Sequence, residues 1–143
     1  MPNASSGAVA CEHDSLSADL NLALVVSGSP ITRIVVARIA ERAGLKAIEE
    51  TPENAAAALL SRRPGMVLLD GGAGNCDCDC LLDSLAAQRV AAGGRVPFVV
   101  LLSNVTQPGR MQTDSAIDTV VAKPVTPERL LPLIMSTLDR LRD

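Results

Sequence analysis

Four short apolar segments of this chain each end at small or polar residues. The segments are 22–26, 66–69, 98–102 and 119–122, and they are followed by Ser27 and Gly28, by Asp70, by Ser103, and by Lys123 and Pro124. Ligands of open parallel sheets bind beside the carboxyl ends of the strands. We therefore expect the residues at these four ends to converge on one polar pocket.

The pattern between these segments is an alternation of strand and helix. A further short strand is predicted at 45–49, and the fourth strand is predicted to start at Val96. Helical periods and caps predict helices after Ser29, after Thr51, around Leu81, Leu82, Leu85 and Ala86 as inward residues, and after Thr126, with only a short or poorly formed helix in 104–118. Pro132 is expected to kink the last helix or delay its start. Continuously apolar strands alternating with helices indicate a parallel sheet that is covered on both faces.

Length and composition place this sheet in one domain. The chain has 143 residues, of which 48% are apolar, and a formal net charge of -3. Residues 1–19 have no hydrophobic period and are predicted to be a flexible tail or linker, which leaves 20–143 as the domain. The acidic balance argues against nucleic-acid binding, and no apolar run is long enough for a bilayer. With no signal-peptide pattern at its start, the chain is expected to be cytoplasmic.

Three of the strand ends carry motifs that resemble the receiver domain of two-component response regulators. The motifs are LLD ending at Asp70, a hydroxyl residue at Ser103, and AKP at 122–124. The resemblance implies a flavodoxin-like, doubly wound α/β fold with five parallel strands in the order 2-1-3-4-5. It also implies that Asp70 is the phosphoacceptor, that Lys123 and Ser103 contact the phosphoryl group, and that the Lys123–Pro124 bond is cis.

The chain departs from the family pattern at the metal site and at the switch. Family members have an acidic pair after the first strand, where this chain has Ser27 and Gly28. Magnesium prefers carboxylate oxygens, and here only Asp70 and a backbone carbonyl such as that of Gly72 are expected to be available, so we expect weak Mg²⁺ binding and no resident cofactor. The aromatic switch residue of the family is replaced by Val120.

A run of cysteines raises the alternative of a metal or redox site. Cys76, Cys78 and Cys80 lie after the third strand, and Cys11 and His13 lie in the tail. Their spacing fits a zinc site only loosely, because paired ligands are usually separated by two to four residues. A variable loop with nearby thiols is the preferred interpretation, and a metal or redox module on the same fold stays an alternative.

Two surfaces are candidates for protein contacts. Arg33, Arg38 and Arg42 are interpreted as a solvated face of the first helix, which in receiver domains commonly meets histidine-bearing partners. The last helix and fifth strand are predicted to carry an apolar patch for a homodimer or partner, made of Ile117, Val121, Leu131 and Met135. The resemblance implies a histidine kinase, a phosphotransfer protein or another signalling protein as partner.

The sequence thus predicts an atypical bacterial receiver module without enzymatic activity, which acts through protein contacts and is phosphorylated weakly or not at all at Asp70. A working phosphoacceptor receiver, standalone or part of a hybrid histidine kinase, is the main alternative.

Overall fold

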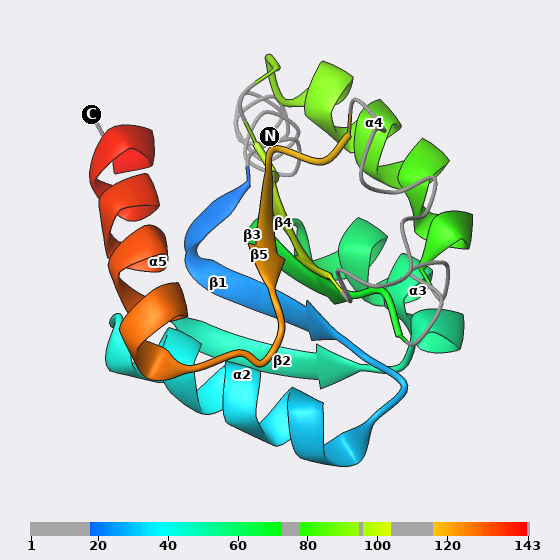
Figure 1. Cartoon of the computed structure of the whole chain (residues 1–143). Coiled ribbons are helices and arrows are strands. Elements are labelled where there is room, and N and C mark those ends of the chain that lie inside the picture. The colour runs from blue at the N-terminus through cyan, green and yellow to red at the C-terminus, as the bar shows by residue number, and fades with distance from the viewer. Residues whose placement is uncertain (1–17, 73–77, 95, 104–115, 143) are drawn as a thin grey trace.

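The computed structural model has three layers, with a parallel sheet between two pairs of helices (Figure 1). It describes residues 18–72, 78–94, 96–103 and 116–142. The sheet has five strands in the order β2-β1-β3-β4-β5, and all four neighbouring pairs are parallel. The predicted fold class and strand order are confirmed.

The elements follow the predicted alternation of strand and helix. The strands are β1 (Asp19–Val26), β2 (Lys46–Glu50), β3 (Pro64–Asp70), β4 (Phe98–Ser103) and β5 (Thr119–Ala122). The helices are α2 (Pro30–Arg42), α3 (Pro52–Arg62), the 3-10 turn η1 (Asp79–Leu81), α4 (Leu82–Ala91) and α5 (Pro127–Arg142). Within the described residues, no helix is long and apolar enough to cross a membrane.

Two aliphatic cores join the sheet to its helices. One face of the sheet packs against α2 and α5, through buried residues such as Val25, Leu68 and Ile134. The other face packs against α3, η1 and α4, through Leu24, Leu69 and others. Because both faces are covered, the buried parts of the middle strands are apolar, and the polar residues Asp70 and Ser103 stand at the carboxyl ends of β3 and β4.

Local sequence explains two of the sharpest features. Ser29 caps α2, since its hydroxyl accepts a hydrogen bond from the amide of Thr32 at 3.3 Å. Gly65 lies where β3 starts beside β1, and a Cβ atom there would come within 2.9 Å of the carbonyl of Asp19. Pro64 and Gly65, which were expected only to stop α3, therefore also begin β3.

Several boundaries differ from the predictions. β1 begins at Asp19 rather than Leu22, because its first residue bonds to the carbonyl of Arg63 at 2.8 Å. β2 and β4 are shifted toward the C-terminus, and the segment before β4 contains a cis Val96–Pro97 bond. The predicted weak helix in 104–118 lies mostly outside the described residues.

The expected inward face of α4 is wrong at one residue, and of the two effects expected of Pro132, a kink or a delayed start, the delayed start is not seen. Ala86 was expected to point inward, but it is exposed, and Gln88 is buried in its place because its amide donates to the carbonyl of Leu59 on α3. α5 starts at Pro127 and continues through Pro132, so that proline does not delay the helix.

The predicted dimer patch is not one continuous surface. Ile117 packs against the core on the α3 and α4 side, whereas Val121 and Leu131 pack against the core on the α2 and α5 side. Only Met135, which is 51% exposed, faces solvent strongly. Ile117 lies before β5 begins at Thr119, so it does not share the strand face of Val121, which the sequence argument had not taken into account.

Candidate functional site

The polar strand ends meet at one edge of the sheet, with Asp70 at their centre. β1 and β3 are neighbours, so Ser27 follows β1 beside Asp70, and the side chain of Lys123 reaches Asp70 from the end of β5. Asp70 is 4% exposed and Ser27 is fully buried. The predicted convergence of Ser27, Asp70 and Lys123 is what the structure shows.

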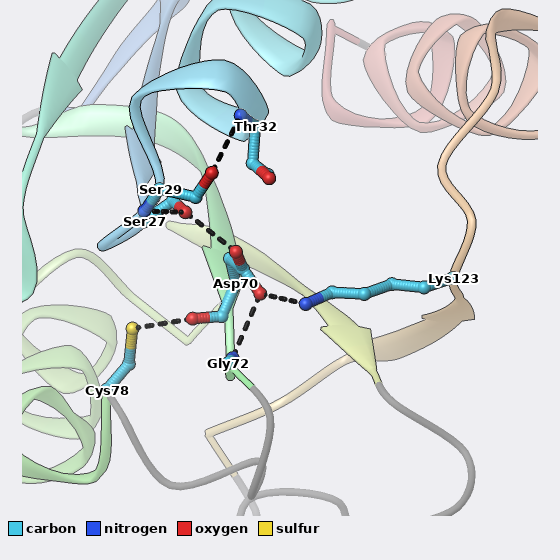
Figure 2. A network of polar contacts seen from close by, with 7 residues as sticks. All are labelled: Ser27, Ser29, Thr32, Asp70, Gly72, Cys78 and Lys123. Carbon is cyan, nitrogen blue, oxygen red and sulfur yellow. Dashed lines mark hydrogen bonds and ion pairs between the residues drawn. The ribbon is translucent and has the colours of Figure 1, made fainter.

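Both carboxylate oxygens of Asp70 have protein donors (Figure 2). The hydroxyl of Ser27 donates to Oδ2 at 2.6 Å. The amide of Gly72 donates to Oδ1 at 2.9 Å, and the ammonium of Lys123 forms an ion pair with the same oxygen. Hydrogen bonds to a charged acceptor are about twice as strong as those between neutral groups. The carboxylate is thereby fixed in orientation on three sides.

The contact to Ser27 extends into the first turn of α2. The Ser27 hydroxyl also accepts the amide of Ser29 at 3.0 Å, so it acts as donor and acceptor at once. The guanidinium of Arg33 donates to the carbonyl of Ser27 at 2.7 Å. A short chain of hydrogen bonds thus connects Asp70 to the start of this helix (Figure 2).

These contacts also set the ionisation of Asp70. Burial by itself raises the pKa of the carboxyl, but the hydrogen bonds from Lys123, Ser27 and Gly72 and the charge of Lys123 outweigh it. The pKa of Asp70 is therefore below its ordinary value of 3.8. Asp70 is an anion at neutral pH, and Lys123 is its counter-ion.

The site does not fit a divalent cation well. Magnesium takes oxygen ligands in near-octahedral geometry, commonly including one or two carboxylates. The described contacts of Asp70 are with a hydroxyl, an amide and an ammonium, and an ammonium on Oδ1 opposes a second cation. Across the described part of the chain, no group of three His, Cys, Asp or Glu residues is placed to hold a metal ion.

The remaining predicted positions lie near the same edge. Ser103 ends β4, is fully buried, and its carbonyl accepts the amide of Lys123 at 3.0 Å. The Lys123–Pro124 bond is cis, as predicted. Gly28 is exposed after β1, and Val120 is 42% exposed on β5. Gly72 contacts Asp70 through its amide, and its carbonyl as a metal ligand stays a prediction.

The two described cysteines lie in different environments. Cys78 is fully buried and its thiol donates to the backbone carbonyl of Asp70 at 3.3 Å, whereas Cys80 is exposed. Cys11, His13 and Cys76 lie outside the described residues. The thiol of Cys78 therefore supports the main chain of the site, a role that the spacing of the cysteine run did not indicate.

Arg33 is the other residue whose role the sequence analysis missed. It was interpreted as part of a solvated basic face, and Arg38 and Arg42 are indeed exposed. The Arg33 side chain instead turns toward the loop after β1 and binds Ser27. The spacing between the two residues matches no helical capping pattern, so no sequence signal marks this contact.

A doubly wound, five-stranded parallel sheet in the order β2-β1-β3-β4-β5 is the fold of receiver domains. Comparison with solved structures gives the same result for the fold. A CheY-like response regulator receiver domain from Methylobacillus flagellatus is 19% identical, with a TM-score of 0.64 over 83% of this chain and 99% of that one.

Two further solved structures are similar. The signal receiver domain of a signal transduction histidine kinase from Syntrophus aciditrophicus is 20% identical, with a TM-score of 0.68 over 85% of this chain and 92% of that one. The pseudo-receiver domain of the CikA protein is 22% identical, with a TM-score of 0.64 over 86% and 98% of the two chains. No family model and no curated protein sequence matches the chain. The chain thus has the CheY-like receiver fold.

Proposed function

We propose that this chain is an atypical receiver module of two-component signalling, which acts through protein contacts and accepts little or no phosphoryl group at Asp70. One observation carries the proposal, namely that the Ser27 hydroxyl holds Oδ2 of Asp70 at 2.6 Å, after the strand where receiver domains carry their metal-binding acidic pair. Phosphoryl transfer depends on cation charge and on positioning of the reacting groups. At this edge the single carboxylate of Asp70 would have to hold the cation and also accept the phosphoryl group.

The surface beside the site suits a protein partner. Ile31 is 74% exposed and Ile34 is 50% exposed on α2, next to the exposed Arg38. An apolar strip with a basic neighbour fits an amphipathic helix that has acidic flanks. We propose a cytoplasmic histidine kinase, phosphotransfer protein or other signalling protein as the partner, and no enzymatic activity for the chain itself.

A working phosphoacceptor is the second candidate, and the ionisation of Asp70 favours it. The lowered pKa keeps the carboxylate charged, as a nucleophile requires, and Lys123 and Ser103 stand at the strand ends where receiver domains have their phosphoryl-contacting residues. In this function Lys123 would leave Oδ1 to neutralise the incoming phosphoryl oxygens.

Intact mass after incubation with acetyl phosphate, with and without Mg²⁺, separates the two candidates. We expect no adduct on the wild-type chain in either condition. A metal-dependent adduct of one phosphoryl group that is absent from Asp70→Asn would establish the working phosphoacceptor instead.

A gain-of-function variant tests the physical reason. Ser27→Asp places a second carboxylate next to Asp70, so we expect Mg²⁺ to raise its melting temperature by about 3 °C or more, since ligand binding to the folded state stabilises it. The wild-type melting temperature in Mg²⁺ should equal that in a Mg²⁺-free buffer of the same ionic strength. An equal response of both chains would contradict the assigned role of Ser27.

A further inference from the structure

An apolar groove lies beside the site, between α2 and the segment that follows β5. Its volume is about 250 Å³, and it is lined by Ile31, Thr32, Val35 and Val36 on one wall and by Lys123, Pro124 and Val125 on the other. The first wall belongs to the N-terminal half of α2. The second wall is the connection between β5 and α5, so the two walls come from distant parts of the sequence.

One oxygen of Asp70 holds the second wall. The ammonium of Lys123 pairs with Oδ1, and Lys123 is also one of the residues that line the groove. Lys123 is directly followed by Pro124 and Val125, so the ion pair restrains the start of this wall. The Lys123 side chain is 29% exposed, whereas that of Asp70 is 6% exposed.

The other oxygen holds the first wall through a relay. Ser27 donates to Oδ2 and accepts the amide of Ser29, and the Ser29 hydroxyl accepts the amide of Thr32, which lines the groove. Arg33, one residue further along α2, binds the carbonyl of Ser27. The two arms of the Asp70 network end at Thr32 and at Lys123 (Figure 2). These two residues lie on different walls of the same groove.

We propose that the charge on Asp70 clamps the two walls of this groove, with Ser27 as the positioning residue that connects the carboxylate to α2. When a neutral side chain replaces Asp70, Lys123 loses its counter-ion and the Ser27 hydroxyl loses an ionic acceptor. Both walls then loosen together. This coupling needs no metal ion and no phosphoryl group, so it stands or falls independently of the proposed function.

Amide hydrogen exchange in a double-mutant cycle tests the relay. The four chains are wild type, Ser27→Ala, Asp70→Asn and the double variant, and the readout is exchange at Thr32 relative to Leu59, which is buried in α3 on the other face of the sheet. We expect each single variant to speed relative exchange at Thr32 by about tenfold, the scale of one lost hydrogen bond, and the double variant to add little more.

A matched control separates the clamp from general destabilisation. Thr137→Val removes another buried hydroxyl, on α5, and should leave the ratio of Thr32 to Leu59 exchange unchanged. The proposal is overturned if Ser27→Ala speeds exchange at Thr32 and Leu59 equally, or if the effects of Ser27→Ala and Asp70→Asn simply add.

If Ser27→Ala does not fold, methyl NMR spectra of Asp70→Asn test the coupling of the two walls without it. Methyl signals from both walls, at Val35 and Val125, should shift or broaden together. Those of Ile48, which lines a separate pocket with α3, should stay in place. A response at Val35 without one at Val125, or at neither residue, contradicts a clamp.

Discussion

The guanidinium of Arg89 lies 2.5 Å from the carboxylate of Asp118 and joins α4 to the residue before β5. The same guanidinium donates to the backbone carbonyls of Pro97 at 3.1 Å and Ala116 at 3.0 Å. The carboxylate in turn accepts the amide of Val99 at 2.8 Å. These bonds gather the segments that lead into β4 and β5, at the end of the sheet opposite Asp70.

Asp118→Ala should therefore destabilise the chain by about 1–3 kcal/mol, because it removes the acceptor of the Val99 amide and the counter-ion of Arg89. The free energy of unfolding in urea measures the loss. Asp139→Ala on exposed α5 surface is the control and should change that free energy by less than about 0.5 kcal/mol. Equal effects of the two substitutions would mean that the Arg89 contact contributes nothing beyond surface charge.

The two lysines of the chain offer a matched pair of substitutions. Lys123→Met keeps the length of the side chain but removes the counter-ion of Asp70, so the pKa of Asp70 should rise and the chain should lose about 1–3 kcal/mol of stability. Lys46→Met, at an exposed position of β2, should cost less than about 0.5 kcal/mol. Chemical denaturation at neutral pH gives both values. An unchanged free energy of unfolding in Lys123→Met would show that the ion pair does not contribute to stability.

Acid should remove the contribution of Asp70 to stability. Its folded-state pKa is lower than the ordinary 3.8, so the stabilisation is present above pH 3.8 and disappears as the pH falls through the folded-state value. As the pH falls from 3.8 through the folded-state pKa, the unfolding free energy of the wild type should fall relative to that of Asp70→Asn. Urea denaturation of both chains at pH 7 and near pH 3 checks this, and a difference that is independent of pH would refute it.

Two glycines at strand ends should differ in how much an alanine substitution destabilises the chain. Gly65→Ala places a Cβ atom within 2.9 Å of β1 backbone atoms, and overpacking of this kind costs about 1–3 kcal/mol. Gly28→Ala meets no atom within 4 Å and should change stability by less than about 0.5 kcal/mol. Thermal unfolding of the two variants side by side tests the close approach of β1 and β3.

The fold was predictable because the middle strands β1, β3 and β4 are largely buried on both faces. Each predicted strand ends within about one residue of its observed end. In the middle strands, a polar or small residue at the carboxyl edge stops an otherwise apolar run. The start of β1 was less predictable. Asp19 joins the strand through a backbone bond to Arg63, and backbone pairing of this kind leaves no trace in the hydrophobic pattern.

The residues of the candidate site could be predicted from the sequence, but the hydrogen bonds between them could not. Asp70, Lys123 and Ser27 were all identified from their places at strand ends, but Ser27 was interpreted only as a lost metal ligand. In the structure, its hydroxyl donates a hydrogen bond to Oδ2 of Asp70. The direction of a short side chain depends on the backbone of the following turn and on Arg33, and neither is readable from single-residue spacing.

The open space around Gly28 has a consequence for redesign of the site. Apart from its chain neighbours, no atom lies within 4 Å of where its Cβ would be, and the residue is exposed beside the carboxylate edge. An acidic side chain can therefore be introduced at this position without repacking a neighbour. The number of carboxylates at this edge can thus be changed by one substitution while the sheet and its helices keep their packing.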